Sequence, residues 1–375
     1  MPSPSPASSA ADRPAVAVVA LSARALAQAA RRAGVHAFAF DLFGDCDTRA
    51  AALRARVLPG SLDAGFEPAA LLDAVRAVSP EIAGLVYGAG FEDRPGLLAE
   101  LAAVVPLLGN TPETVRRVKD PRVFFPALET LGIAFPEVRL ERPATGADWL
   151  VKRIGGSGGG HVGAGRQDGD RYYQRRADGR PVSALFLADG RGARLVGLSE
   201  QWAAPSARGG RFRYGGAVQP AEVSTGRHAD IAAALAALVP AFGLKGLNSA
   251  DFLVRGDACD LLEVNPRPGA TLDLFESGSL FAQHCAACRG ALPPAHGPAP
   301  ARAAAVIYAP RAIRIPERVD WPRWAADLPH GEETIACDAP LCSVLADAPT
   351  PGAARALVMA RRAEILAQLM GQTAP

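Results

Sequence analysis

The stretch Asp260–Gly269 constrains the fold more than any other part of this 375-residue chain. Two leucines lead directly into Glu263, Asn265 and Arg267, which are spaced two residues apart. Side chains two apart on an extended segment lie on one face, so these three groups should form a row. Burying polar groups without partners costs roughly 2–7 kcal/mol each. The pattern therefore predicts a strand that carries a binding site for a metal and phosphates, with the arginine steadying an oxyanion.

A further carboxylate, Asp251, stands twelve residues before Glu263. It falls at the head of an expected apolar strand, Phe252–Val254. Carboxylate and amide oxygens are the ligands that hard cations prefer. The sequence therefore predicts a Mg²⁺ site made by Asp251, Glu263 and Asn265, with Mn²⁺ as an alternative metal.

The bulk composition excludes several functional classes. The length predicts two or three domains, and 49% hydrophobic with 21% charged residues is ordinary for an α/β protein. A net charge of +2 gives no field for nucleic acid or an anionic membrane. No apolar run approaches the roughly 18–20 residues of a spanning helix. The first 13 residues resemble a disordered tail without a basic leader, so we expect a cytoplasmic protein.

The N-terminal part is expected to alternate strands and helices. Strands are predicted at 14–20 and 35–41 around a helix at 22–32, with Ser22 as its N-cap and Gly34 as its end. The pattern continues with a helix at 68–78, a strand at 82–87 and a helix at 95–105. This order predicts a parallel, helix-covered sheet over residues 14–110. The turn at 20–24 lacks the Gly-x-Gly-x-x-Gly pattern, which argues against a dinucleotide site.

The loop after the last of these strands contains Gly88, Gly90 and Glu92. Ligands often bind at such loops in parallel sheets. A tight turn without a ligand explains the same residues, and both interpretations stay open.

A glycine-rich segment follows an apolar strand at 149–153 that contains Lys152. Helices are predicted before this strand, at 112–118 and 122–131. A glycine-rich run cannot form a stable helix or strand, but its backbone amides can wrap phosphates. A flexible linker is the alternative, although a lysine inside the preceding strand favours a flap. The flap candidates run towards His161 and are Gly155, Gly156, Ser157, Gly158 and Gly159.

Two other features carry weaker expectations. A loop over 204–216 contains Arg211 and Arg213, which are either substrate-binding or merely exposed charges. Cys285 and Cys288 form half of a metal or redox motif, or are simply buried thiols on a helix. The remaining predicted elements are a hairpin at 182–187 and 193–198, a helix at 228–242, a linker at 293–300, a strand at 303–308 and a helix at 353–370.

Together these motifs resemble the ATP-grasp superfamily, and more narrowly the ATP-dependent carboligases related to biotin carboxylase. The resemblance rests on the order of Lys119, Lys152, the glycine-rich flap, a hinge strand and the metal carboxylates. It implies an α/β ATP-grasp fold (with an α+β lid) preceded by an open parallel-sheet domain. The implied divisions are a tail at 1–13, a first domain at 14–110, an ATP-grasp domain at 111–290 with its lid at about 120–190, and a C-terminal extension at 291–375.

The resemblance also implies roles for individual residues. Lys119 and Lys152 would contact ATP phosphates, and Arg267 would stabilise an acyl phosphate. Many relatives carry Glu where this chain has the shorter Asp251. Backbone groups of the hinge residues Gln174, Arg175 and Arg176 would hydrogen-bond to adenine. Asp178, which follows them, would contact the ribose.

The implied activity is an ATP-dependent carboxylate–amine ligase that proceeds through an acyl phosphate. Its partners would be a small carboxylic acid and an amine, and such relatives are often homodimers. The tracts 84–92 and 108–113 resemble ligases that join glutamate to an aromatic amine in the synthesis of methanofuran-type one-carbon cofactors. The alternatives are a carboxylase, a small-molecule kinase and a non-catalytic nucleotide-binding protein.

Overall fold

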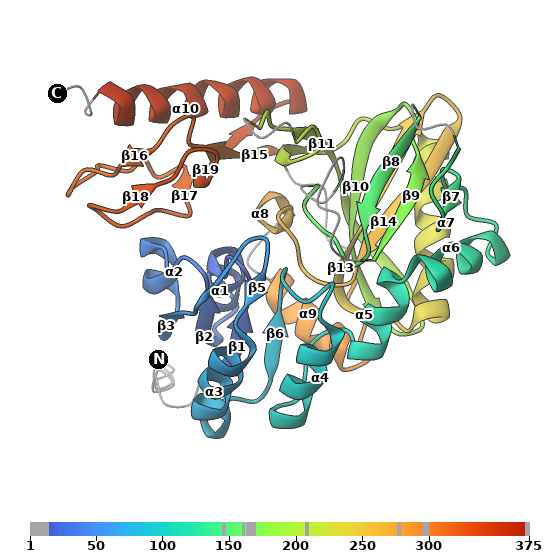
Figure 1. The fold of residues 1–375 in the computed structure, drawn as a ribbon, viewed down its shortest axis with the longest axis horizontal. Coiled ribbons are helices and arrows are strands. Elements are labelled where there is room, and N and C mark those ends of the chain that lie inside the picture. Colours follow the sequence, from blue (N-terminus) through green and yellow to red (C-terminus); the bar gives the residue numbers. More distant parts are fainter. Residues whose placement is uncertain are drawn as a thin grey trace, which may run out of the picture.

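The structure is a computed structural model, shown in Figure 1. It describes residues 15–144, 148–159, 162, 170–206, 210–275, 279–294 and 300–371. Within these residues, no helix is long and apolar enough to cross a membrane.

The N-terminal part is a parallel four-stranded sheet in the order β3-β2-β1-β6, as the strand–helix alternation predicted. Val16 and Val18 of β1 pack on one face of this sheet and Ala17 and Val19 on the other. Because both faces are covered, the strand is hydrophobic throughout rather than alternating. The strands are β1 (Ala15–Val19), β2 (His36–Asp41), β3 (Arg54–Val57) and β6 (Leu85–Tyr87), with a small hairpin of β4 (Gly60–Ser61) and β5 (Gly65–Phe66). The helices are α1 (Arg24–Arg32), α2 (Cys46–Ala51), α3 (Pro68–Val78) and α4 (Pro95–Val104), with a short 3-10 turn at Ser79–Glu81.

The predicted start of α1 at Ser22 is wrong. The N-cap is Ala23, whose amide donates to Asp41 Oδ2 at 3.1 Å, while the Ser22 hydroxyl donates to Asp327. A carboxylate from the end of β2 thus replaces the local cap. The predicted end is confirmed, since Gly34 has a positive φ of 72°.

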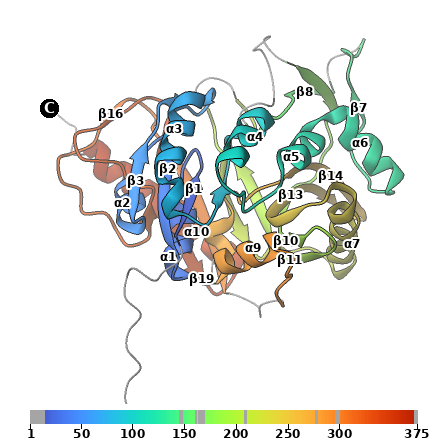
Figure 2. The ribbon, with the colours of Figure 1, turned by 90° about the horizontal axis from the view of Figure 1, so that it is seen from below.

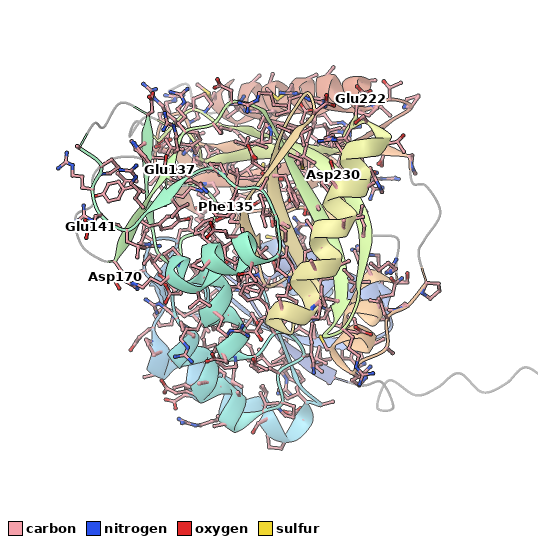
Figure 3. The ribbon with its side chains drawn as sticks, turned by 90° about the vertical axis from the view of Figure 1, so that its right-hand side faces the viewer. Phe135, Glu137, Glu141, Asp170, Glu222 and Asp230 are labelled. Carbon is pink, nitrogen blue, oxygen red and sulfur yellow. The ribbon has the colours of Figure 1, made fainter. Side chains whose placement is uncertain are left out.

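A three-stranded sheet, ordered β7-β9-β8, lies next in the chain, in the region predicted to be the lid (Figure 3). The glycine-rich segment connects two antiparallel neighbours within it, β8 and β9, as the flap interpretation requires. The elements here are α5 (Pro112–Lys119), α6 (Pro121–Thr130), β7 (Val138–Arg139), β8 (Trp149–Arg153) and β9 (Arg171–Arg175).

The largest element is an eight-stranded sheet, ordered β14-β13-β10-β11-β12-β15-β19-β17. Helix α7 (Thr225–Phe242) packs its buried Ile231, Leu235 and Leu238 on one face of this sheet, and Figure 3 shows the helix lying across it. Helix α9 (Leu280–Cys288) lies between the other face and the N-terminal sheet (Figure 2). The strands are β10 (Arg180–Asp189), β11 (Ala193–Ala203), β12 (Tyr214–Gln219), β13 (Lys245–Arg255), β14 (Ala258–Asn265), β15 (Ala301–Tyr308), β17 (Ala325–Ala326) and β19 (Pro340–Ala348).

The C-terminal part continues this sheet instead of forming a separate one. Strand β12 pairs with β15, so the expected boundary near 290 separates segments that share one sheet, and the division at 110 and 290 stays a prediction. The other elements are α8 (Leu272–Phe275), β16 (Ile313–Arg314), β18 (Thr334–Ile335) and α10 (Pro351–Gly371).

Arg24 of α1 holds the C-terminal part against the N-terminal sheet. Its guanidinium donates to Asp273 at 2.6 and 2.7 Å and to Asp327 at 3.0 Å, and the arginine is only 4% exposed. Asp47 also lies 3.9 Å from the same group. Bidentate arginine–carboxylate pairs fix orientation as well as distance, so three distant segments are locked together here.

Candidate active site

The candidate metal carboxylates meet on two neighbouring strands. Asp251 on β13 and Glu263 on β14 are opposite each other in the antiparallel register. Asn265, at the end of β14, donates its side-chain amide to Asp251 at 3.2 Å and to Glu263 at 3.4 Å. Asp251 lies in the middle of β13, so its expected place at a strand head is wrong; the strand already begins at Lys245.

The two lysines predicted to contact phosphates reach the same place. Lys119 Nζ, at the end of α5, donates to Asn265 Oδ1 at 2.9 Å and lies 3.8 Å from Glu263 Oε2. Lys152 is 5% exposed on β8. Burial lowers the pKa of Lys152, and the nearby charges of Glu263 and Asp251 oppose that shift. Residues between positions 119 and 265 therefore converge on one site.

The electrostatics of the two carboxylates fit a bound cation. Burial raises the pKa of Asp251, and the adjacent charge of Glu263 raises it further. Two crowded carboxylates with an amide oxygen nearby are the hard donors that Mg²⁺ takes. Asn265 Oδ1 faces Lys119 here, so the two carboxylates fit the metal more directly than the amide does. Among the described residues, no three His, Cys, Asp or Glu side chains gather as a metal cluster.

Arg267 departs from the row that the strand pattern predicted. The strand ends at Asn265, and Arg267 turns towards the N-terminal sheet, where its Nε donates to Glu92 Oε1 at 2.7 Å. The other oxygen of Glu92 accepts from the amides of Gly90 and Phe91, at 2.8 and 3.0 Å. Burial alone would raise the pKa of Glu92, but the charges of Arg267 and Lys119 lower it to about 2. The loop is thus a tight turn whose carboxylate positions Arg267, and a ligand at this loop stays a prediction.

The glycine flap lies against two other loops. A Cβ on Gly155, which has a positive φ of 75°, would stand 2.6 Å from Asp93 Cα. A Cβ on Gly159 would collide with the carbonyl oxygen of Phe212, and the Tyr214 amide donates to Gly158 O at 3.3 Å. Glycine is therefore required where the flap meets these loops. Gly156 accepts from Lys119 at 3.5 Å, Ser157 is half-buried, and Gly160 and His161 lie outside the described residues.

The hinge offers fewer free backbone groups than expected. The Arg175 amide donates to Glu137 O at 2.8 Å and the Arg176 amide to Asp148 O at 2.6 Å, so neither amide is left for adenine. Asp178 is exposed. The Gln174 side chain is 1% exposed, and its Nε2 has no partner among the described residues. A buried donor without a partner is uncommon and costly, so Gln174 is the hinge side chain that we expect to meet a ligand acceptor.

Sequence reasoning missed several residues around the site. Tyr172 lies two residues before Gln174 on β9 and therefore on the same face. It lines a small pocket with Phe124 and Phe125 next to Lys119. Gln201 on β11 donates to Asp251 at 3.3 Å. Nothing local marks Gln201, because its partner is fifty residues away; the aromatic pair after Lys119 was the available signal for the pocket.

The weaker candidates are placed elsewhere. Arg213 pairs with Asp338 at 2.8 Å and lies 3.6 Å over the Tyr308 ring. It therefore links its loop to the C-terminal part, and its charge is already balanced by a carboxylate. Arg211 is exposed. Gly88 lies where a Cβ would be 2.7 Å from Ala20 Cβ, which explains it by close packing.

The cysteine pair lies on α9, where Cys285 is buried and Cys288 is half-buried, so the buried-thiol interpretation holds for Cys285. His284 accepts from the Leu247 amide at 2.8 Å through Nδ1, and its Nε2 is 2.9 Å from Leu108 O. Burial lowers the pKa of His284 to about 4 and raises the pKa values of Cys285 and Cys288 to about 11 and about 12. Both ring nitrogens of His284 are therefore engaged in hydrogen bonds with the backbone.

Comparison with known proteins agrees with this geometry. Residues 118–271 match the ATP-grasp domain family. Biotin carboxylase from Campylobacter jejuni, solved with β-γ-ATP, has 14% identity and a TM-score of 0.71, over 91% of this chain and 89% of that one. L-amino acid ligase from Bacillus licheniformis has 15% identity and a TM-score of 0.67, over 92% and 96%.

One curated relative is the carbamoyl phosphate synthase large chain from Kineococcus radiotolerans. It is 24% identical over 258 residues, which are 60% of this chain and 23% of that protein. The chain thus spans about a quarter of the length of this relative.

The chain carries an ATP-grasp domain, in an α/β fold shared with biotin carboxylase and its relatives. ATP and Mg²⁺ are the cofactors of this family.

Proposed function

We propose that this chain is an ATP-dependent carboxylate–amine ligase that forms an amide through an acyl phosphate. The observation that carries the proposal is that Lys119, Asp251, Glu263 and Asn265 meet in one place. The buried charges of Lys152 and Arg267 lie near enough to interact with these carboxylates. Structural and linker roles do not account for this combination of buried charges.

The proposed role of each residue follows from its charge. Lys119 and Lys152 would neutralise phosphate oxygens, while Gln174 would face the nucleotide and the glycine flap would exclude water. Mg²⁺, held by Asp251 and Glu263 with Asn265 beside them, would supply further charge neutralisation. Arg267, fixed by Glu92, would face the carboxylate as it attacks the γ-phosphate and the oxyanion as the amine displaces phosphate.

The specific reaction proposed is the joining of glutamate to an aromatic amine, in the synthesis of a methanofuran-type one-carbon cofactor. Its support is the resemblance of the tracts at 84–92 and 108–113 and the likeness to an L-amino acid ligase. We propose a small acid and a small amine as the partners.

A carboxylase is the second candidate, because the fold resembles biotin carboxylase at a TM-score of 0.71. Bicarbonate would then take the place of the larger acid beside Arg267.

The test is a coupled ADP-release screen with Mg²⁺ over acids and amines, with hydroxylamine to trap acyl phosphates. The proposal expects ADP and hydroxamate that depend on the acid, with glutamate preferred, and an amide once tyramine replaces hydroxylamine. A Lys152→Ala preparation reveals any contaminating ATPase. Bicarbonate-dependent ADP formation that needs no amine would instead establish the carboxylase.

A further inference from the structure

Tyr214, at the start of β12, carries a buried polar group that the proposed mechanism does not use. Its hydroxyl oxygen is buried and has no hydrogen-bond partner among the described residues. Leaving a buried hydroxyl unpaired is costly and uncommon. The position of this hydroxyl relative to the candidate active site therefore decides whether it is fitted to a ligand.

A β-bulge sets the direction of this side chain. The register between β11 and β12 shifts at Ala203, which pairs with Tyr214, and Gly215 is the extra residue on β12. Successive side chains of a regular strand alternate between its two faces, and one inserted residue reverses the alternation that follows. Bulges re-aim side chains in this way and are frequent beside active sites.

The face of the sheet onto which Tyr214 turns is the face that carries Asp251. Tyr214 packs against Ala217. Ala217 is opposite Gln201 on β11, and the Gln201 side chain donates to Asp251 at 3.3 Å. The Tyr214 amide also donates to Gly158 O of the glycine flap at 3.3 Å. Tyr214 therefore lies beside the candidate active site, between its metal carboxylates and its flap.

The charges around the hydroxyl are negative. Burial raises the pKa of Tyr214, and the charges of Asp273 and Asp251 raise it further. The hydroxyl therefore stays neutral, and the negative potential at its oxygen attracts a cation. Arg24 pairs with Asp273 but is shared with Asp327, so its single charge does not cancel the two carboxylates.

Two other arginines of this region are also paired with carboxylates. Arg302 donates to Asp273 O at 3.3 Å, and its guanidinium pairs with Asp347 at 2.5 Å. Arg213 pairs with Asp338 at 2.8 Å. An anionic ligand would therefore meet arginines that are already neutralised, whereas a cationic ligand would meet the negative potential.

The chemical group that fits this environment is an ammonium. A phenol oxygen accepts hydrogen bonds as well as donating one, and an ammonium offers N–H donors. The same carboxylates that attract the ammonium also keep it protonated. A protonated nitrogen has no lone pair with which to attack an acyl phosphate. The ammonium held here therefore belongs to the acid substrate and not to the amine that attacks it.

We propose that the Tyr214 hydroxyl binds the ammonium group of an amino acid that serves as the acid substrate. The inference rests on the proposed ligase function. The reacting carboxylate of this amino acid would face Arg267, as in the proposed mechanism. Tyr214 would then determine specificity, because an acid without the ammonium would leave the buried hydroxyl unpaired.

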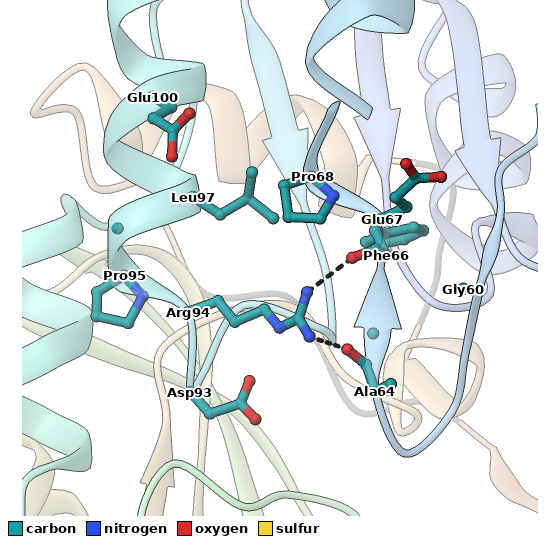
Figure 4. Close-up of a pocket in the computed structure, with 12 residues that line it drawn as sticks. Gly60, Ala64, Phe66, Glu67, Pro68, Asp93, Arg94, Pro95, Leu97 and Glu100 are labelled. Carbon is teal, nitrogen blue, oxygen red and sulfur yellow. Dashed lines mark hydrogen bonds between the residues drawn. The ribbon is translucent and has the colours of Figure 1, made fainter. Parts of the chain in front are cut away.

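Another acidic concavity of the molecule provides a control. Glu67 and Glu100 line the open hollow between the β4–β5 hairpin and the start of α4 (Figure 4). In its wall, Arg94 donates to Phe66 O at 2.7 Å and to Ala64 O, which holds the hairpin in place. The residues that line this hollow do not include any of the proposed reaction centre. Removing its carboxylates should therefore leave substrate selection unchanged.

The experiment measures hydroxamate formation, with ATP, Mg²⁺ and hydroxylamine, for pairs of acids that differ only in the ammonium group. The pairs are glutamate with glutarate, and phenylalanine with 3-phenylpropionate. For the pair that the wild-type chain accepts, kcat/KM should be at least 100-fold higher for the amino acid. Tyr214→Phe should reduce this preference at least tenfold, because it removes one hydrogen bond to a charged group. The KM for ATP should stay unchanged.

Stability separates a ligand-binding role from a structural one. Tyr214→Phe removes a hydroxyl that has no partner, so the urea midpoint should stay the same or rise. Tyr308→Phe is the matched control, because its hydroxyl donates to Tyr214 O at 2.9 Å. This control should lose stability and keep the preference for the amino acid. The double variant Glu67→Gln with Glu100→Gln should also keep that preference.

The two proposals fail separately. Acid-dependent hydroxamate with an unchanged preference in Tyr214→Phe, or without any preference in the wild type, overturns the ammonium site and leaves the ligase standing. If no acid yields hydroxamate, the ligase assignment is refuted, and calorimetry of the same acid pairs with Mg²⁺ and ADP tests the site. Tighter binding of the amino acid that is lost in Tyr214→Phe then supports the site, and equal binding of both acids overturns it.

Discussion

The pair between Arg267 and Glu92 yields the sharpest prediction, because both side chains are buried and come from different parts of the fold. They are 8% and 4% exposed, and the carboxylate also accepts two backbone amides. In Glu92→Gln the guanidinium stays buried opposite a neutral amide. Removing one partner of a buried pair costs about 3–5 kcal/mol.

The lowered pKa of Glu92 gives a free energy of the same size. The pKa of Glu92 falls from 4.5 to about 2 on folding. At 1.36 kcal/mol per unit, the ionised form contributes about 3 kcal/mol to stability. The shift is downward, so this contribution is fully present above pH 4.5 and is lost as the pH falls towards 2.

The assay is urea unfolding followed by tryptophan fluorescence, with kinetics in parallel. At pH 7 we expect Glu92→Gln to lower the free energy of unfolding by about 3 kcal/mol, and the gap from wild type to shrink between pH 4.5 and 2. The kcat should fall more than the KM for ATP rises, because Arg267 loses its position. The control Glu81→Gln breaks an exposed pair with Arg54 and should cost under about 1 kcal/mol. A loss below about 1 kcal/mol in Glu92→Gln, or a gap that does not depend on pH, would refute the reasoning.

Three further predictions concern the phosphate end of the site. Glu263→Gln and Lys152→Ala should each reduce ATP turnover by about 10²–10³ with circular dichroism unchanged; wild-type-like activity in either would count against the assignment. Because the pKa of Asp251 is raised, protons should compete with the metal as the pH falls, so the apparent Mg²⁺ affinity from activity titrations should weaken on acidification. Asp251→Asn should bind Mg²⁺ weakly at every pH, and a wild-type pH profile in this variant would exclude the explanation. Gly159→Ala should raise the KM for ATP more than Gly158→Ala, because both have a positive φ but only Gly159 meets a backbone carbonyl; equal effects would show that the flap contact does not matter.

Local periodicity accounts for what the sequence predicted well. The buried β1, the helix at 112–119 and the strands on either side of the flap are marked by apolar runs, Pro at a helix start and glycine stops, all of which act over a few residues. The spacing of Glu263 and Asn265 likewise places both beside Asp251, because the antiparallel register sets Asp251 opposite Glu263 and Asn265 lies two residues further along the same strand. The row could not be extended to Arg267, since the strand ends at Asn265 and Pro266 follows.

What could not be predicted depends on partners far apart in the chain. The Ser22 cap was displaced by Asp41, and the charge of Arg24 is satisfied by Asp273 and Asp327, about 250 and 300 residues away. Asp41 serves the cap only because β2 lies beside β1, which local propensity does not encode. Loop residues with several hydrogen-bond options, such as Glu92, similarly take the partner that the assembled fold presents.

These long-range contacts give the N-terminal sheet a chemical role. Glu92 and Asp93 are consecutive residues of one loop, yet the first fixes Arg267 and the second contacts the flap and is paired with Arg153. A displacement of this loop would therefore move Arg267 and the glycine flap together. Under the proposed function, in which catalysis depends on precisely held groups, the N-terminal sheet would be the support on which the arginine and the flap are aligned.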